Sequence, residues 1–271
     1  MQNSLENRFA KRKLKSPVTI IIGIKCLTGI VIACDSRTID PSGYVNDSAQ
    51  KLHEIHFQDG NGAIVGEAGN AEFSSRAVEM IKSSASQQKF GDYRTVASCA
   101  EKAISELKQQ IREQYKGTAE ELQKHFEAYS FELMIAHYWK NEPYIYTLNF
   151  ASGIATKKDR DYCAIGCGWI LADFLISRLD LSEFGTGHGM WTAVYAVEEI
   201  KKFDSRCGGR TRAAVVIDLD GMSKAQVTEH DDGMKEAIAE ALAFADESKS
   251  EWRKIAQRRI ENVIEKRKSA S

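Results

Sequence analysis

Three residues near the start of the chain are of types that together can activate a hydroxyl group. Thr19 begins the apolar run 19–26, and Asp35 ends the run 29–35. Lys51 follows Asp35 by 16 residues, the same spacing that separates Asp35 from Thr19. A hydroxyl becomes a nucleophile when a base or a cation and its orienting partner lie beside it. The alternative is that the threonine favours a strand, the aspartate ends one and the lysine is a surface charge.

The elements around these residues decide whether they meet. The runs 19–26 and 29–35 are rich in β-branched residues and are separated by a turn with glycine, which predicts a buried hairpin. In an antiparallel hairpin the start of one strand lies beside the end of the other, so Thr19 and Asp35 become neighbours. The first residue of a third predicted strand, 51–57, would reach the same corner if that strand paired alongside.

The rest of the chain alternates runs of strands with pairs of helices. Further strands are predicted at 63–66, 131–138, 144–150, just before 165 and at 212–219. Helical spacing of apolar residues occurs at 70–87, about 92–115, about 169–182, about 190–203 and from 234 onward. This order predicts helices on the outer faces of antiparallel sheets rather than a doubly wound parallel sheet. The glycine-rich segment 185–189 follows a helix and lacks lysine, so it predicts a loop rather than a phosphate site.

Composition and charge exclude several classes of protein. The chain has 271 residues, of which 43% are hydrophobic and 28% charged, with a formal net charge of −1. These values are typical of a globular protein and give no sign of a nucleic-acid partner. No apolar stretch is long enough to span a membrane, and the basic segment 1–18 lacks the apolar core of a secretory signal. We therefore expect a cytoplasmic protein of one domain.

The six cysteines do not form a metal-site pattern. None belongs to a C-x-x-C pair or has a histidine at zinc spacing, and His53 and His56 lack a third partner. Most of the cysteines are therefore expected to be reduced core residues. We predict no metal and no cofactor.

Five ordered motifs carry a resemblance to a known family. They are TIIIGI (19–24), TGIVIACDSRT (28–38), GEAG (66–69), IGCG (165–168) and DSRCGG (204–209). In this order the segments resemble the landmarks of a proteasome β-type subunit, a member of the N-terminal-nucleophile threonine peptidase superfamily. The resemblance implies an α+β protein with a four-layer αββα sandwich of two antiparallel sheets. It also implies a leader or propeptide at 1–18, a catalytic domain at 19–232 and a C-terminal helical extension at 233–271.

The resemblance assigns roles to individual residues. Thr19 would supply the nucleophilic oxygen and, once the leader is removed, an α-amine that acts as the base. Lys51 would favour the deprotonated groups, and Asp35 would hold Lys51 in place. The backbone N–H of Gly69 would bind the oxyanion. The residues implied around the amine and its water are Asp204, Cys207, Gly208 and Cys167.

The sequence departs from the family pattern in two places. Val18 stands where the family usually has glycine before the nucleophile, and a β-branched residue crowds the carbonyl that must be attacked for self-cleavage. Until that bond is cut, the nitrogen of Thr19 is an amide without basicity. Cys167 and Cys207 stand where the family usually has serine, and a thiol is a weaker hydrogen-bonding group. Their implied proximity would permit a disulfide, which a reducing cytoplasm disfavours.

The resemblance also places a specificity pocket beside the nucleophile. Its lining residues would be Thr38, Ala49, His53, Glu67 and Ala71. If the carboxylate of Glu67 points into this pocket, it predicts a preference for a basic or polar side chain before the cut bond. If the carboxylate points outward, it is an ordinary surface charge.

Taken together, these features predict a threonine endopeptidase that hydrolyses protein or peptide substrates. The implied partners are further copies of the chain in a homo-oligomeric ring and an ATPase unfoldase, with no nucleic acid and no membrane. Two alternatives stay open. One is a non-catalytic, unprocessed ring or scaffold subunit, and the other is an amidohydrolase that acts on small amides in a larger, more open pocket.

Overall fold

A computed structural model describes residues 19–39, 44–128 and 130–228 of the chain. By its internal contacts the chain divides into a unit Met1–His230 and a unit Asp231–Ser271. The predicted leader at 1–18, Val18 and the predicted C-terminal helical extension at 233–271 lie outside the described residues. The domain boundaries drawn from the sequence therefore stay predictions.

The first sheet is built around the predicted N-terminal hairpin. Its five antiparallel strands lie in the order β10 (Tyr162–Gly166), β1 (Ile20–Cys26), β2 (Gly29–Asp35), β11 (Thr211–Leu219) and β12 (Met222–Thr228). The pairing of Ile21 with Cys34 confirms the hairpin. Because β10 and β11 flank this hairpin, both β1 and β2 are central strands, which explains why their residues are almost all buried.

The second sheet follows the chain order. Its five antiparallel strands are β5 (Leu52–His56), β6 (Gly62–Gly69), β7 (Phe131–Trp139), β8 (Glu142–Asn149) and β9 (Ala155–Lys157). A separate two-stranded ribbon, β3 (Thr38–Ile39) and β4 (Val45–Asn46), lies in the chain between the two sheets. The ribbon belongs to the segment that carries the chain from the end of β2 to the start of β5.

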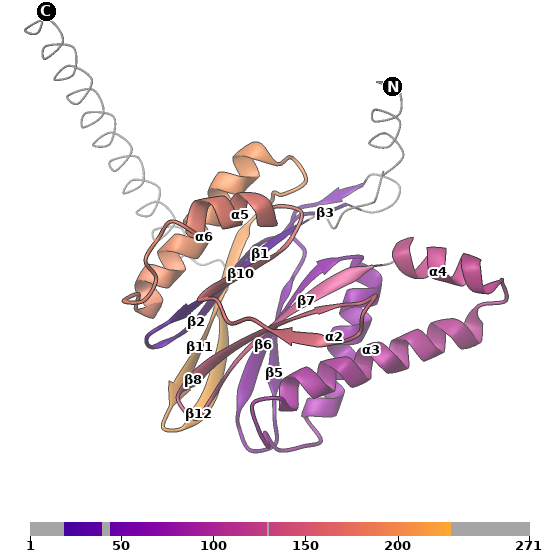
Figure 1. The fold of residues 1–271 in the computed structure, drawn as a ribbon, viewed down its shortest axis with the longest axis horizontal. Helices are drawn as coiled ribbons and strands as arrows, with labels where there is room; N and C mark the ends of the chain where they lie inside the picture. Colours follow the sequence, from indigo (N-terminus) through magenta and orange to yellow (C-terminus); the bar gives the residue numbers. More distant parts are fainter. Residues whose placement is uncertain (1–18, 40–43, 129, 229–271) are drawn as a thin grey trace, which may run out of the picture. The chain divides into compact units, whose positions relative to one another are not determined.

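The helices cover the outer faces of the sheets. They are α2 (Ala71–Ala85), α3 (Thr95–Gln114), α4 (Ala119–Ala128), α5 (Trp169–Ile176) and α6 (Thr186–Phe203). Helices α2 and α3 pack on the second sheet, and α5 and α6 pack on the first (Figure 1). The buried face of α3 includes all the apolar residues that the helical spacing predicted and also Ala97 and Ile111. The arrangement confirms the predicted four-layer αββα sandwich.

Two of the apolar layers that hold these parts together adjoin the second sheet. One lies between the sheets and joins Ile21, Ile30 and Ile32 of the first sheet to Leu52 and Met134 of the second. The other fills the space between the second sheet and helices α2 and α3. The inner layer is the one that fixes the spacing between β1–β2 and β5–β6, and hence between the side chains at their ends.

The structure differs from the strand pairing and from the loop that the sequence suggested. The strand at 51–57 does not pair beside the hairpin, because β11 occupies that edge of β2 and β5 pairs with β6 instead. Segment 185–189 is not a loop but the cap and first turn of α6. There Gly189 lets the helix approach β1, since a Cβ on it would lie 2.3 Å from the Cys26 sulfur. The ribbon β3–β4 and the elements α4, β9 and β12 had not been predicted.

A buried histidine on β7 marks a point where stability depends on pH. The ring of His137 is fully buried, stacks on Tyr144 at 5.3 Å and meets the edge of Phe90 at 5.1 Å between ring centroids. Desolvation by this burial lowers the pKa of His137 to about 4. The folded chain therefore keeps this imidazole neutral at pH values where the unfolded chain protonates it.

We predict that the free energy of unfolding falls as the pH is lowered through this window. The unfolded chain binds the proton below its ordinary pKa of about 6.5, whereas the folded chain binds it only near 4. The stabilisation is complete above pH ~6.5, and about 3 kcal/mol is lost by pH ~4. Urea unfolding of the native chain and of His137→Phe measures this difference. If the free energies of unfolding of the native chain and of His137→Phe differ by the same amount from pH ~6.5 to ~4, the prediction is wrong.

Candidate active site

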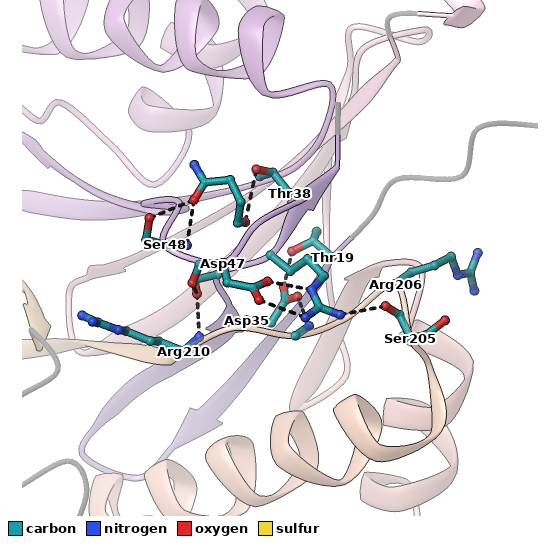
Figure 2. Close-up of polar contacts among 12 residues, drawn as sticks. Thr19, Asp35, Thr38, Asp47, Ser48, Ser205, Arg206 and Arg210 are labelled. Carbon is teal, nitrogen blue, oxygen red and sulfur yellow. Dashed lines mark hydrogen bonds and ion pairs between the residues drawn. The ribbon is translucent and has the colours of Figure 1, made fainter. Parts of the chain in front are cut away.

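Thr19 lies at the head of β1, beside the carboxylate that ends β2. Its hydroxyl donates a hydrogen bond to Oδ1 of Asp35, and the backbone N–H of Ile20 donates to the same oxygen at 3.1 Å. Both Thr19 and Asp35 are fully buried. The hairpin thus brings the two residues together as predicted, and Figure 2 shows their side chains side by side.

Lys51 reaches this corner from the opposite sheet. It directly precedes β5, and its ammonium donates to Oγ1 of Thr19, to the carbonyl of Arg37 and to Oδ1 of Asp35, the last at 2.9 Å. Only 3% of its side chain is exposed. The second carboxylate oxygen of Asp35 accepts the N–H of Gly208 at 2.8 Å. The buried ammonium of Lys51 therefore lies against the hydroxyl oxygen of Thr19. The carboxylate of Asp35 that balances its charge is hydrogen-bonded through both of its oxygens.

Arg37 is a residue of the site that sequence reasoning did not single out. Its Nε and Nη2 donate to the two carboxylate oxygens of Asp47 at 2.7 and 3.0 Å, and its Nη1 donates to the carbonyl of Ser205 at 3.0 Å (Figure 2). The hydrogen bonds from Arg37 lower the pKa of the Asp47 carboxyl. The guanidinium links the segment after β4 to the loop after α6. The backbone carbonyl of Arg37 also accepts a hydrogen bond from the ammonium of Lys51. The place of Arg37 in the TGIVIACDSRT motif was the signal available.

The backbone of Thr19 is held through its carbonyl. That oxygen accepts the N–H of Cys167 at 2.7 Å and its thiol at 3.1 Å. Gly166 makes this approach possible, because it has a φ of +91° and a Cβ on it would lie 2.3 Å from the same oxygen. The IGCG segment therefore positions the nucleophile candidate from the side of β10.

Cys167 and Cys207 lie in contact near this carbonyl. Their sulfur atoms are 3.3 Å apart, and both cysteines are free. Asp204 caps the C-terminus of α6, and Arg206 binds its carboxylate at 2.8 and 2.9 Å, which lowers the pKa of Asp204. One carboxylate oxygen and the two sulfurs lie within 4.8 Å of one another. Because the guanidinium of Arg206 already neutralises this carboxylate, the cluster is poorly suited to a cation.

A cavity of about 240 Å³ opens beside Lys51. Its lining residues are Thr38, Asn46, Ala49, Gln50, Lys51, Glu67, Gly69, Ala71, Ser74 and Ser75. Four of the five predicted pocket residues belong to this set, whereas His53 does not. Gly69 has a φ of +121°, and a Cβ there would lie 2.7 Å from the Cα of Phe131. The backbone at the cavity therefore requires glycine at this position.

The side chain of Glu67 is buried in the wall of the cavity rather than exposed at the surface. Glu67 is 6% exposed, and its Oε1 lies 3.2 Å from Nε2 of His53. The hydroxyl of Ser75 donates to both carboxylate oxygens, at 3.3 and 3.4 Å. His53 thus lies behind Glu67 and orients it. This burial excludes the orientation in which Glu67 is an ordinary surface charge, and its role in specificity stays a prediction.

Comparison with protein families decides which family this chain belongs to. The family model described as proteasome subunit matches residues 18–216, which is well over half of the chain. The chain belongs to the proteasome subunit family. This confirms the resemblance drawn from the five motifs, all of which lie within the matched residues.

Solved structures show that the proteasome-type fold is shared with Anbu proteins, described as an ancestral β-subunit. Anbu from Yersinia bercovieri has a TM-score of 0.68 at 14% identity, over 86% of this chain and 96% of its own. A Gly-1 mutant from Hyphomicrobium sp. strain MC1 gives 0.65 at 16%, over 88% and 99%. The helical assembly of the Anbu complex from Pseudomonas aeruginosa gives 0.67 at 14%, over 86% and 95%. At these identities the likeness shows the fold alone. Comparison with curated proteins gives no match.

In this proteasome-type subunit, four separated segments meet at one corner, where three of them contact Thr19 and the fourth binds Asp35. The segments are the end of β2, the start of β5, the β10–α5 turn and the loop after α6. The geometry places an activatable hydroxyl beside a cation and next to a polar cavity. No helix in the described part of the chain is long and apolar enough to cross a membrane.

Proposed function

We propose that the chain is a threonine endopeptidase whose nucleophile is Oγ1 of Thr19 after removal of residues 1–18. The observation that carries this proposal is the buried hydrogen-bonded set of Thr19, Lys51 and Asp35. An ammonium group in a site with little water stabilises an adjacent alkoxide far more than it does in bulk solvent. Asp35 orients that ammonium group, and its second carboxylate oxygen is held by the N–H of Gly208.

The base in this proposal is the α-amine that cleavage before Thr19 creates. A free α-amine has an ordinary pKa of about 8, so it accepts the proton of Oγ1 directly or through a water at neutral pH. The acyl-enzyme forms when Oγ1 attacks a peptide carbonyl and the amine of the leaving segment departs with that proton. The N–H of Gly69 is the proposed donor to the oxyanion, since Gly69 and Lys51 both line the cavity.

The size of the cavity supports a peptidase over an amidohydrolase of small amides. Pockets that enclose a whole small-molecule ligand have volumes of about 300–1,000 Å³. The cavity here, about 240 Å³, is smaller and suits one side chain of an extended substrate. Its polar lining, with Glu67 buried in the wall, further suits a polar or basic side chain.

Processing is the first testable consequence. We predict that the purified chain has lost residues 1–18 and begins at Thr19, and that it cleaves fluorogenic peptides. The variant Thr19→Ala lacks the oxygen that would attack the preceding carbonyl, so it keeps its full length and has no activity. Intact-mass spectrometry and peptide hydrolysis measure both results. Thr28→Ala, which removes an exposed hydroxyl in the β1–β2 turn, is the matched control and stays processed.

The scaffold alternative gives the opposite result in the same experiment. A full-length native chain, found in an assembled particle and without peptide hydrolysis, contradicts the peptidase proposal. It supports a non-catalytic subunit whose Thr19 nitrogen stays an amide.

The second consequence concerns the residue before the cut bond. We predict that peptides ending in Arg are cleaved faster than those ending in Leu or Asp, because the acidic Glu67 is buried and is one of the residues that line the cavity. A hydrogen bond to a charged group contributes about 1.5–3 kcal/mol. Glu67→Gln should therefore lower kcat/KM for the Arg peptide roughly 10- to 100-fold and change the Leu peptide little.

Glu72→Gln is the matched control for this measurement. It makes the same substitution on an exposed residue of α2 that does not line the cavity, so the preference should be unchanged. Fastest cleavage after Asp, or an equal loss for all three peptides in Glu67→Gln, would rule out this role.

We also propose that copies of the chain assemble through helix α5. Three large apolar residues of this short helix are more than half exposed, namely Trp169, Ile170 and Phe174. Apolar side chains gathered on one surface are typical of an interaction site. The Pseudomonas aeruginosa relative is described as a helical assembly, which supports a second copy of this chain as the partner.

Assembly through α5 predicts that one charge on this surface separates the copies. Phe174→Glu would bury an unpaired carboxylate in the interface, so the mass measured by light scattering should fall toward that of a single chain. Leu27→Glu, at an exposed residue of the β1–β2 turn, is the control and should keep the native mass. An unchanged mass in Phe174→Glu would place the interface elsewhere.

A further inference from the structure

Two thiols of different burial lie in contact beside Thr19. Cys167 belongs to the β10–α5 turn and is half-buried, whereas Cys207 lies in the loop after α6 and is 1% exposed. Their sulfur atoms are 3.3 Å apart, although 40 residues separate them in the chain. The described fold thus brings two cysteines within reach of a bond of about 2.0 Å without a large movement of the backbone.

The surroundings make the two thiols unequal. The hydrogen bond with Cys207 lowers the pKa of Cys167, and the positive charge of Arg206 acts in the same direction. The same hydrogen bond and burial raise the pKa of Cys207. Cys167 is therefore the more readily deprotonated thiol of the pair. Reactive cysteines are partly exposed and near positive charge, which describes Cys167.

The other cysteines lack these features. Burial raises the pKa of Cys26 and Cys163 to about 11 and that of Cys34 to about 12, and it also raises the pKa of Cys99. All four are buried, so they stay protonated and shielded at neutral pH.

We propose that Cys167 and Cys207 are a modification site at which a hydroperoxide converts the two thiols into a disulfide. Cys167 reacts with the hydroperoxide, and the buried Cys207 then attacks the oxidised Cys167 to form the disulfide.

The reaction is balanced by one hydroperoxide. The Cys167 thiolate attacks the terminal oxygen of ROOH, the O–O bond breaks, and the departing alkoxide takes a proton to give ROH and a sulfenic acid. Cys207 then attacks the Cys167 sulfur, the S–S bond forms, and the S–O bond breaks with release of water. The two thiols lose two electrons in total, and the peroxide gains them.

The cross-link acts on the groups that hold the nucleophile. The sulfurs must approach by more than 1 Å, from 3.3 Å to about 2.0 Å. The N–H of Cys167 binds the Thr19 carbonyl at 2.7 Å, and the N–H of Gly208, next to Cys207, binds Asp35 at 2.8 Å. If the proposed peptidase function holds, a displacement of this size at the site lowers activity by about 100-fold.

Thiol counting on the full chain tests the cross-link itself. The chain is treated with a small excess of hydrogen peroxide, denatured and alkylated, and the linked peptides are identified by mass spectrometry. We expect two fewer alkylated cysteines than the six in the sequence and one linked peptide pair that contains residues 167 and 207. Dithiothreitol should restore all six. Six alkylated cysteines after peroxide, a sulfinic acid at Cys167 without a link, or a link to another cysteine overturns the proposal.

Variants make the assignment specific. Cys167→Ser and Cys207→Ser should each abolish the link, while Cys163→Ala, on the strand that leads to Cys167, should keep it. A circular dichroism spectrum and melting temperature establish that each variant is folded; if Cys207→Ser is unfolded, Cys207→Ala replaces it.

Peptide hydrolysis is measured on the same samples as a separate arm. If Thr19 is the nucleophile, formation of the disulfide lowers peptide hydrolysis in the native chain and in Cys163→Ala, and dithiothreitol restores it. A chain without hydrolysis in either redox state refutes the peptidase function and leaves the thiol count to decide the disulfide.

Discussion

A buried ammonium group between the two sheets is the interaction on which the rest of the site depends. Desolvating a cation and a carboxylate is costly, and the cost is offset only when each has its full set of partners. The ammonium of Lys51 has three acceptors, and the carboxylate of Asp35 accepts from Ile20 and Gly208 as well as from Lys51. These partners come from both sheets and from the loop after α6. A shift of one sheet against the other would therefore leave a charge unpaired.

This requirement explains features that otherwise look unrelated. The inner apolar layer sets the separation of the sheets, so that one lysine side chain spans it. After β2 the chain passes through the ribbon β3–β4 and does not add another strand to the first sheet until β10. Lys51, directly before β5 of the second sheet, therefore reaches Thr19 and Asp35 from across the interior. Arg37 then joins the outer segments around this corner through Asp47 and Ser205. The cavity adjoins the charge because Lys51 is part of its wall.

The sequence was sufficient for the parts of this arrangement that depend on local pattern. The β-branched runs predicted the hairpin, and the five motifs predicted the layers and the neighbours of Thr19. It was insufficient where a choice depended on contacts between distant segments. Which edge β5 would join depended on β11, which lies far later in the chain and already pairs with β2. The glycines at 185–189 indicated a loop by composition, yet packing against Cys26 makes the small residue necessary within a helix. The direction of Glu67 depended on His53 and Ser75, which no spacing rule connects.

The way in which Thr19 is attached has a consequence for how a new chain terminus would behave. Every contact described for this residue lies on its side chain or on its carbonyl, and β1 begins with the next residue. None of these contacts uses the residues that precede it. A chain cut at that point would keep all of these contacts, so its new amino group would belong to a residue that folding has already ordered. Folding has then already ordered this chain end, so substrate binding does not carry the entropic cost of ordering it.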